Sequence, residues 1–324
     1  MKIVSTSFLL VGSLCATTLA RADGLYVSFF NTDSVGMYDA QSGALINATF
    51  ASVQDALGLA VGPDNNLYVG SDSLASGNGA GIMRFGLGGT TGTAPGTFVD
   101  HVSDNALNNP QGLAFQGGNL YAGDITAGNI FVYNTLGNHA GTLSSPSLGA
   151  PNGLAFGASG TLYVADLNQG NVLSYSGGNF AQVNSQPGKF DAAHSVAVGG
   201  NGKLYVLNIS GATGGIYQLN PGDGSALKIV DYSTSTFQPA DMVVGPDGKL
   251  YVSGQDLNTG EGEILNYGLD GSGGTVFADT GSGTSPGYIT FETVPEPSAW
   301  SIAGIGVVVL AMFRRRAVKR EAKA

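Results

Sequence analysis

The chain has 324 residues, of which 52 are glycine, 11% are charged and one is cysteine. This composition is typical of many short strands joined by glycine turns, and the length suits one large all-β domain. Cys15, the single cysteine, lies in an apolar N-terminal segment, which excludes a disulfide framework and a thiolate metal site in the mature protein. Between residues 23 and 294, five basic residues stand against twenty-one acidic ones, so we expect no nucleic-acid partner.

The N-terminal segment, residues 1–22, is predicted to be a secretory signal peptide. Lys2 supplies the basic start, residues 8–14 the apolar centre, and Ala20–Ala22 a small-x-small cleavage site. A lipoprotein signal at Cys15 is the alternative, but a leucine precedes that cysteine where the lipoprotein pattern has a small residue. We therefore expect ordinary export of the mature chain.

One motif recurs through most of the chain and organises the domain that we expect over residues 23–292. Its clearest copy is Pro151–Asp166, PNGLAFGASGTLYVAD, which is typical of two short strands joined by a tight turn. Two weaker strands follow each copy, so each unit should hold four strands. The tyrosine of the second strand recurs at intervals of 42, 53, 42, 42 and 46 residues, which is the range of propeller blades. These tyrosines are Tyr26, Tyr68, Tyr121, Tyr163, Tyr205 and Tyr251.

The first and last units are incomplete, which predicts how the array closes. Gly24–Val27 matches the second half of a repeat without a first half, and Pro286–Phe291 matches a first half without a second. Joined together, they complete one blade in which the C-terminal segment is the inner strand. The sequence therefore predicts an all-β, six-bladed β-propeller whose two ends pair, which removes the open sheet edges of a linear array.

The repeat P-x-G-L-A-F/V-x-x-x-G-x-L-Y-V-A-D, followed by G-N-x-x-x-Y, resembles the NHL repeat. More loosely, it resembles the gluconolactonase group of six-bladed propellers. The resemblance covers residues 24–291. It implies the fold rather than an activity, because this architecture carries hydrolases, lyases and binding modules alike.

The candidate ligand positions lie at the mouth of the predicted central channel, just before the inner strands. When the units are aligned, the position of Asn152 is occupied in two others by Gln111 and His194, and Asp241 lies one step further on. Residues near such positions hold a divalent metal in the gluconolactonase group. The resemblance therefore implies Asn152 as a weak candidate ligand for a metal such as calcium.

The remaining positions of this ring argue against a metal or catalytic centre. A calcium site needs several oxygen ligands, usually including carboxylates, whereas Leu57, Ala240 and Gly287 fill half of the ring. His194 is a candidate general base, but no recognisable serine or cysteine nucleophile motif accompanies it, so a rim histidine is the other interpretation. We therefore expect no catalytic residue, no resident metal and no cofactor.

A short polar residue ends the second strand in several units. Asp124 and Asp166 occupy this place, with Asn208 in a later unit and Asp72 as a further candidate. A carboxylate or amide at a strand end accepts backbone N–H bonds and fixes the turn. We expect these residues to have a structural role.

The tail, residues 293–324, resembles the PEP-CTERM sorting signal. The triplet Pro295-Glu296-Pro297 precedes an apolar segment, Ser298–Phe313, and a cluster of three arginines. The resemblance implies recognition by an exosortase, a membrane-embedded processing enzyme. Sixteen residues make a helix of ~24 Å, a short transmembrane helix whose arginines would stay in the cytoplasm. A permanent anchor is the alternative.

Together these features predict an exported propeller that its tail holds transiently in the inner membrane. After processing, we expect it at the cell surface or outside the cell as a non-catalytic binding or matrix protein. Its expected partner is exopolysaccharide or another surface protein. The alternative is a metal-dependent, gluconolactonase-like lactone hydrolase with a metal near Asn152.

Overall fold

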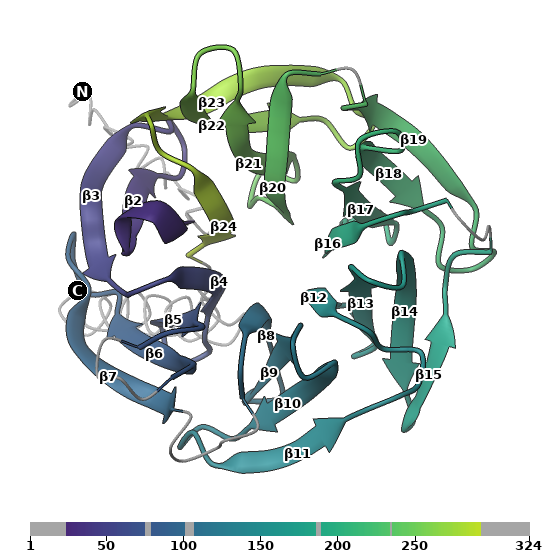
Figure 1. Cartoon of the computed structure of the whole chain (residues 1–324), viewed down its shortest axis with the longest axis horizontal. Helices are drawn as coiled ribbons and strands as arrows, with labels where there is room; N and C mark the ends of the chain where they lie inside the picture. Colours follow the sequence, from purple (N-terminus) through teal and green to yellow (C-terminus); the bar gives the residue numbers. More distant parts are fainter. Residues whose placement is uncertain (1–23, 75–78, 101–106, 186–188, 234, 293–324) are drawn as a thin grey trace, which may run out of the picture. The chain divides into compact units, whose positions relative to one another are not determined.

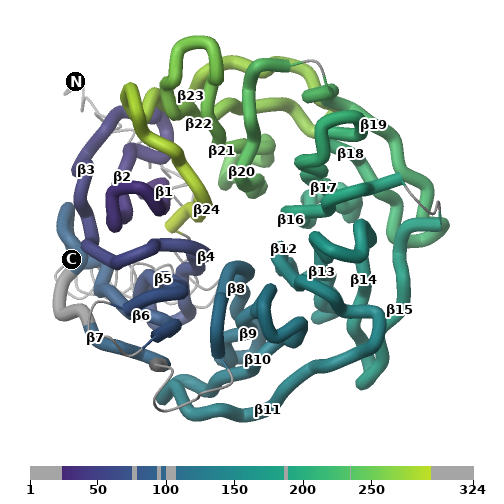
Figure 2. Tube along the Cα trace, viewed as in Figure 1, coloured from purple at the N-terminus to yellow at the C-terminus, as the bar shows by residue number. Residues whose placement is uncertain are grey.

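The structure, a computed structural model, describes residues 24–74, 79–100, 107–185, 189–233 and 235–292. Within these residues, twenty-four strands form six four-stranded antiparallel sheets around a central channel (Figures 1 and 2). The one helical element among them is a 3-10 turn at Phe30–Thr32. No helix in this part of the chain is long and apolar enough to cross a membrane. The predicted signal peptide and the predicted transmembrane segment lie outside the described residues.

The six blades follow one another along the chain, and each runs from an inner strand outward. Blade 1 contains β24 (Pro286–Phe291), β1 (Gly24–Phe29), β2 (Ser34–Asp39) and β3 (Leu45–Ser52). Blade 2 contains β4 (Ala56–Val61), β5 (Asn66–Ser71), β6 (Gly81–Gly86) and β7 (Thr93–Asp100). Blade 3 contains β8 (Pro110–Gln116), β9 (Asn119–Asp124), β10 (Asn129–Tyr133) and β11 (His139–Leu143).

The other three blades have the same order of strands. Blade 4 contains β12 (Pro151–Phe156), β13 (Leu162–Asp166), β14 (Asn171–Ser176) and β15 (Asn179–Gln182). Blade 5 contains β16 (Ala193–Val198), β17 (Leu204–Asn208), β18 (Gly215–Leu219) and β19 (Ala226–Asp231). Blade 6 contains β20 (Phe237–Val244), β21 (Leu250–Asp256), β22 (Glu261–Tyr267) and β23 (Gly273–Ser282).

The hydrophobic core lies between neighbouring blades. The second strands are almost wholly buried, and all six residues of β1 are buried, whereas the outermost strands β11 and β15 are largely exposed. Tyr68 shows how the repeated tyrosine contributes, because its ring packs edge-on against Phe98 and Phe115 at centroid distances of 4.9 and 4.8 Å. Phe98 belongs to the same blade and Phe115 to the next. The tyrosines therefore hold adjacent blades together.

Ring closure occurs as predicted. Strand β24 pairs with β1 in the register Leu25 with Phe291 and Val27 with Ile289. The pairing continues one residue further, because the backbone N–H of Glu292 donates to the carbonyl of Gly24 at 2.8 Å. The two ends of the described chain are thus joined in one sheet (Figure 2).

The strand-end aspartates have the structural role that we expected. Asp124 accepts from the backbone N–H groups of Asn109, Thr126 and Ala127 at 2.8–3.0 Å. Asp166 and Asn208 accept in the same manner at the equivalent places of blades 4 and 5.

The assignment of Asp72 to this group was wrong. In blade 2 the residue paired with the start of the inner strand is Ser71, opposite Ala56. The Ser71 hydroxyl donates to the carbonyl of Gln54 at 2.6 Å, and Asp72 lies one residue beyond the strand. Blade 2 therefore keeps the strand register of blades 3, 4 and 5 at this turn but has a serine where they have an aspartate or asparagine.

Candidate functional site

A β-bulge at the start of each inner strand shapes the mouth of the channel. In blade 4, Pro151 pairs with Asp166 and Gly153 with Ala165, so that Asn152 is an extra residue without a partner on β13. Blades 3, 5 and 6 have the same register shift. Proline at these strand starts is tolerated because the inner strand has an open edge, where no ladder N–H is needed. In blades 3 and 4 the extra residue of the bulge, Gln111 or Asn152, lines the channel cavity.

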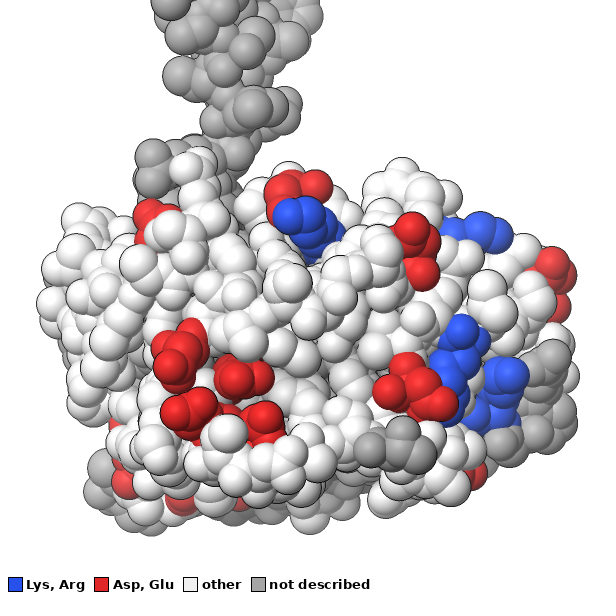
Figure 3. Space-filling model, turned by 90° about the horizontal axis from the view of Figure 1, so that it is seen from above, with Lys and Arg blue, Asp and Glu red and all other residues white. Residues whose placement is uncertain are grey.

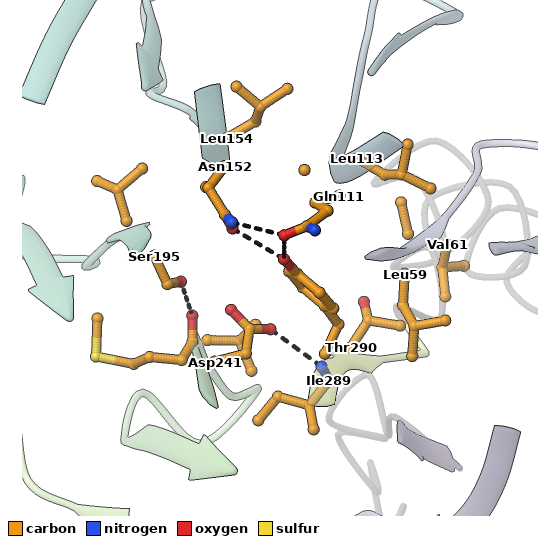
Figure 4. A pocket seen from close by; sticks show the side chains of 17 residues that line it. Leu59, Val61, Gln111, Leu113, Asn152, Leu154, Ser195, Asp241, Ile289 and Thr290 are labelled. Atoms are coloured by element: carbon orange, nitrogen blue, oxygen red, sulfur yellow. Dashed lines mark hydrogen bonds between the residues drawn. The ribbon is translucent and has the colours of Figure 1, made fainter. Parts of the chain in front are cut away.

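Three side chains from three different blades meet across the channel. The Tyr288 hydroxyl lies 2.6 Å from Oε1 of Gln111 and 2.9 Å from Oδ1 of Asn152. Nδ2 of Asn152 donates to the same Gln111 oxygen at 2.7 Å. Figure 4 shows the hydrogen bond between Gln111 and Asn152, and the two contacts of the Tyr288 hydroxyl complete a triangle between strands β8, β12 and β24. The predicted candidates Gln111 and Asn152 are therefore brought together, and the amide of Asn152, which is fully buried, is engaged by its neighbours.

Sequence reasoning missed Tyr288. The aligned repeat assigned Gly287 to the ring, whereas the side chain that crosses the channel belongs to the next residue. Asp241 gave the available signal. It lies two residues before the residue that pairs with the repeated tyrosine of blade 6, and Tyr288 lies two residues before the residue that pairs with the repeated tyrosine of blade 1. The hydroxyl of Ser28 also fixes the backbone of Tyr288, accepting from its N–H at 2.9 Å and donating to its carbonyl at 3.3 Å.

Glycines on the opposite side leave room for this arrangement. At the repeat position of Tyr288, blades 2, 3 and 4 have Gly58, Gly112 and Gly153. A Cβ atom on Gly112 would overlap the backbone carbonyl of Asn152, and one on Gly58 would overlap that of Gln111. The glycines thus let neighbouring inner strands approach closely.

Asp241 is the one carboxylate among the described residues that line the channel cavity. It is 7% exposed, and its Oδ2 accepts from the backbone N–H of Ile289 at 3.0 Å. This bond ties β20 to the open edge of β24. Burial raises the pKa of Asp241, because removal from water disfavours the charged form. Burial, together with the negative charge of Asp241, also holds the pKa of Tyr288 well above its ordinary value.

His194 lies beside the cluster but is not part of its hydrogen-bonded triangle. Its ring stacks on Tyr288 with centroids 6.0 Å apart, and its Nε2 lies 3.4 Å from Nδ2 of Asn152. Its Nδ1 is buried and has no hydrogen-bond partner within the described part of the chain. Burial lowers the pKa of His194 to about 4, so the ring is neutral at pH 7. A lowered pKa makes this histidine a weak general base.

All six inner strands line a cavity of about 200 Å³ at the centre of the channel. Its exposed lining is more polar than apolar, and the polar side chains are those of the Gln111–Asn152–Tyr288 cluster, Asp241, Ser195 and Thr290. Figure 4 labels all of these except Tyr288. The Ser195 hydroxyl donates to the carbonyl of Met242 at 2.9 Å. The apolar wall residues are Leu59, Val61, Leu113, Leu154, Val196, Met242, Val243 and Ile289.

The residues at the predicted metal position do not fit a calcium ion. Calcium takes six to eight oxygen ligands, typically with several carboxylates. Here the amide oxygen of Asn152 lies against the Tyr288 hydroxyl, and its nitrogen donates to Gln111. The described residues contain no group of three histidine, cysteine, aspartate or glutamate side chains arranged to hold a metal. We derive no chemical step through a metal at this site.

Charged side chains of the described propeller lie mostly outside the channel. Figure 3 shows acidic and basic groups, some of them side by side, on a largely uncharged surface. Lys228 pairs with Asp231 at 3.1 Å and Lys249 with Asp247 at 3.3 Å. No lysine or arginine is among the described residues that line the cavity, so no basic side chain lines it to balance Asp241.

Comparisons with known proteins identify the tail and the fold. Residues 293–316 match the PEP-CTERM protein-sorting motif. A search of curated protein sequences found no match to the chain. Among solved structures, a chain of the nidogen/laminin complex is 18% identical with a TM-score of 0.67, over 83% of this chain and 98% of that chain.

Two further solved structures have a similar fold. A streptogramin B lyase is 12% identical with a TM-score of 0.56, over 85% of this chain and 92% of that chain. A Bacteroides fragilis protein assigned as a 6-phosphogluconolactonase is 14% identical with a TM-score of 0.55, over 83% of this chain and 97% of that chain. At these identities the likeness concerns the fold alone. The chain therefore combines a six-bladed β-propeller with a PEP-CTERM protein-sorting motif, which implies export and a membrane-anchored sorting tail.

Proposed function

We propose that this protein is a non-catalytic binding or matrix module of the cell surface. An exosortase removes its tail, and the propeller is then displayed or released, with exopolysaccharide or another surface protein as its partner. The observation that carries this proposal is the match of residues 293–316 to the sorting motif. That motif begins directly after Glu292, the last residue paired with the N-terminal strand.

The contacts among the channel residues argue against a hydrolytic role. Hydrolysis by a metal-bound water needs open coordination positions, and nucleophilic catalysis needs a base within reach of its nucleophile. Gln111, Asn152 and Tyr288 are hydrogen-bonded to one another, and the ring of His194 stacks on Tyr288. The polar residues of the channel therefore serve to join blades.

Mass spectrometry of the mature protein tests the sorting step. The full chain is expressed in an exosortase-containing host and in the same host without the exosortase. We expect loss of the tail near Pro295 only when the enzyme is present. Glu296→Ala should retain the tail, whereas Glu321→Gln, a change in the same tail outside the triplet, should be processed normally. An intact tail in every strain would contradict the proposal and favour a permanent anchor.

Retention on exopolysaccharide prepared from the producing bacterium tests the binding role. We expect the mature propeller to be retained above an unrelated secreted protein of similar acidity. Lactone hydrolysis measured on the same preparation, with and without added Ca²⁺, separates the two functions. Ca²⁺-dependent hydrolysis that Asn152→Ala abolishes would overturn the non-catalytic proposal and establish the lactonase alternative.

A further inference from the structure

A groove lies outside the channel, where the neighbouring blades 5 and 6 meet (Figure 1). It has a volume of about 240 Å³ and is open to solvent on one side. Its lining comes from the loop between β17 and β18, residues 209–214, from the connection after β19, from the start of β20, and from Leu257 in the turn after β21. None of the described residues lines both this 5–6 groove and the channel cavity, so the two are separate sites.

Two departures from the repeat form the 5–6 groove. The loop of residues 209–214 has six residues, whereas the equivalent turns of blades 3, 4 and 6 have four. Strand β20 begins two residues further before its bulge than β16 does, and these two residues, Phe237 and Gln238, pair with Asp256 and Gln255. Blade 4 forms without either feature. The groove is therefore not a requirement of the propeller fold.

Main-chain hydrogen bonds hold the parts of the groove together. The N–H of Tyr232 donates to the carbonyl of Gly214 at 3.0 Å, which ties the connection after β19 to the loop of blade 5. The N–H of Leu257 donates to the carbonyl of Thr236 at 3.0 Å, which ties the turn of blade 6 to the residue before β20. Walls that are ordered in advance lower the entropic cost of binding a ligand.

The lining of the groove is uncharged and combines apolar with polar side chains. No charged residue is among the described residues that line it. Its exposed lining is somewhat more apolar than polar, and Ile209 and Leu257 are 37% and 60% exposed. The Ser210 hydroxyl and the Gln238 amide also line the groove, and neither side chain has a hydrogen bond within the described residues. Both groups can donate and accept hydrogen bonds.

These features fit a neutral ligand with several hydroxyl groups. The hydroxyls of a sugar donate and accept, as Ser210 and Gln238 can, and the C–H groups of its ring can contact the apolar side chains of Ile209 and Leu257. A charged ligand of either sign would lose water without gaining an opposite charge in the groove. The volume of about 240 Å³ lies below the roughly 300–1,000 Å³ of pockets for drug-sized ligands, so the groove suits a single sugar ring.

We propose that the 5–6 groove binds one neutral sugar ring of the exopolysaccharide. The open side of the groove lets the rest of the polymer continue into solvent. This inference rests on the proposed function, because it takes exopolysaccharide rather than a surface protein as the partner. It adds the place of binding and the class of sugar that is bound.

Titration of the mature protein, followed by NMR, tests the class of ligand. The probes are the methyl glycosides of glucose, galactose and mannose, and the three matching methyl uronides, in which a carboxylate replaces the CH₂OH group. We expect at least one neutral glycoside to bind at least about tenfold more tightly than its uronide, because the carboxylate has no cationic partner in the groove. This comparison needs no substitution, so it does not depend on the folding of a variant. Binding of none of the neutral glycosides, or equal binding of the uronides, would overturn the proposal.

Substitution of the two polar side chains tests the place of binding. In the double variant Ser210→Ala/Gln238→Ala we expect binding of the preferred glycoside to weaken at least about tenfold, because two hydrogen bonds to the sugar are lost. Urea denaturation checks that the variant is as stable as the wild type. Gln116→Ala is the matched control and should bind normally, since it removes an exposed glutamine of β8 that likewise has no hydrogen bond within the described residues. Undiminished binding by the double variant would show that the proposed site is wrong.

Retention of the same variants on exopolysaccharide separates this inference from the proposed function. We expect the double variant to be retained less than the wild type and Gln116→Ala. Equal retention of all three would leave the binding role intact and show that the groove is not its site. No retention of the wild type, together with glycoside binding that the double variant loses, would show that exopolysaccharide is the wrong partner while the groove still binds neutral sugars.

Discussion

The two halves of the central channel are built from one repeat position in different ways. Blades 2, 3 and 4 have glycine there, and their inner strands approach each other backbone to backbone. Blades 5, 6 and 1 carry side chains at the same position, which form the cross-links between strands and the polar atoms of the cavity. The side chains are Ser195, Asp241 and Tyr288. The repeat thus determines the fold, and departures from the repeat supply the chemistry.

The half of the channel formed by blades 2, 3 and 4, which has glycine at this position, should be the less tolerant of substitution. Gly112→Ala places a methyl group against the carbonyl of Asn152, so that two inner strands must separate. We expect the free energy of unfolding to fall by about 3 kcal/mol. Urea denaturation measures it, and Gly141→Ala is the matched control. Gly141 lies on β11, the outer strand of the same blade, and an added Cβ would meet nothing within 4 Å.

Gly141→Ala should leave stability unchanged or slightly raised, since alanine restricts the unfolded chain. Equal losses for the two variants would mean that close approach at the channel is not what glycine provides there. The comparison between the halves would then lose its steric basis.

The half of the channel formed by blades 5, 6 and 1 should make the stability of the protein sensitive to pH. Burial lowers the pKa of His194 from 6.5 to about 4. Between these values the unfolded chain binds the proton that the folded chain refuses, so stability falls as the pH decreases from 6.5 toward 4. We expect a loss of about 1–2 kcal/mol at pH 5 from this residue. The raised pKa of Asp241 acts in the opposite direction, so the contribution must be measured as a difference between variants.

That difference comes from urea denaturation of the wild type and His194→Gln at pH 7.5 and pH 5. The variant should lose less stability on acidification than the wild type does. His139→Gln, which removes an exposed histidine of β11, is the matched substitution for comparison. The same pH dependence in wild type and His194→Gln would be inconsistent with a buried neutral ring at this place.

The contrast between the repeat and the departures from it also explains how much of this structure the sequence predicts. The six repeated tyrosines and the split copies at Gly24 and Pro286 determined the number of blades and the closure, because repeated apolar patterns require repeated burial. Gln111 and Asn152 were predicted because they occupy one aligned position. Tyr288 was missed because no other unit has an aromatic residue at its position, where only Asp241 gave a signal, and the folded ring is needed to show that the glycines opposite give it room.

The smallest expected effect concerns the bridge across the channel itself. Tyr288→Phe keeps the ring on His194 but removes the hydroxyl that lies against Gln111 and Asn152. The two amide oxygens that share its single proton then lose that donor, and we expect the free energy of unfolding to fall by about 1 kcal/mol. Tyr163→Phe is the control, since no hydrogen bond of that hydroxyl is present in the described structure and its loss should change stability by less than about 0.5 kcal/mol. A Tyr288→Phe variant as stable as Tyr163→Phe would show that the hydroxyl does not join the two halves of the channel, and that the strand pairing of β24 with β1 closes the ring without it.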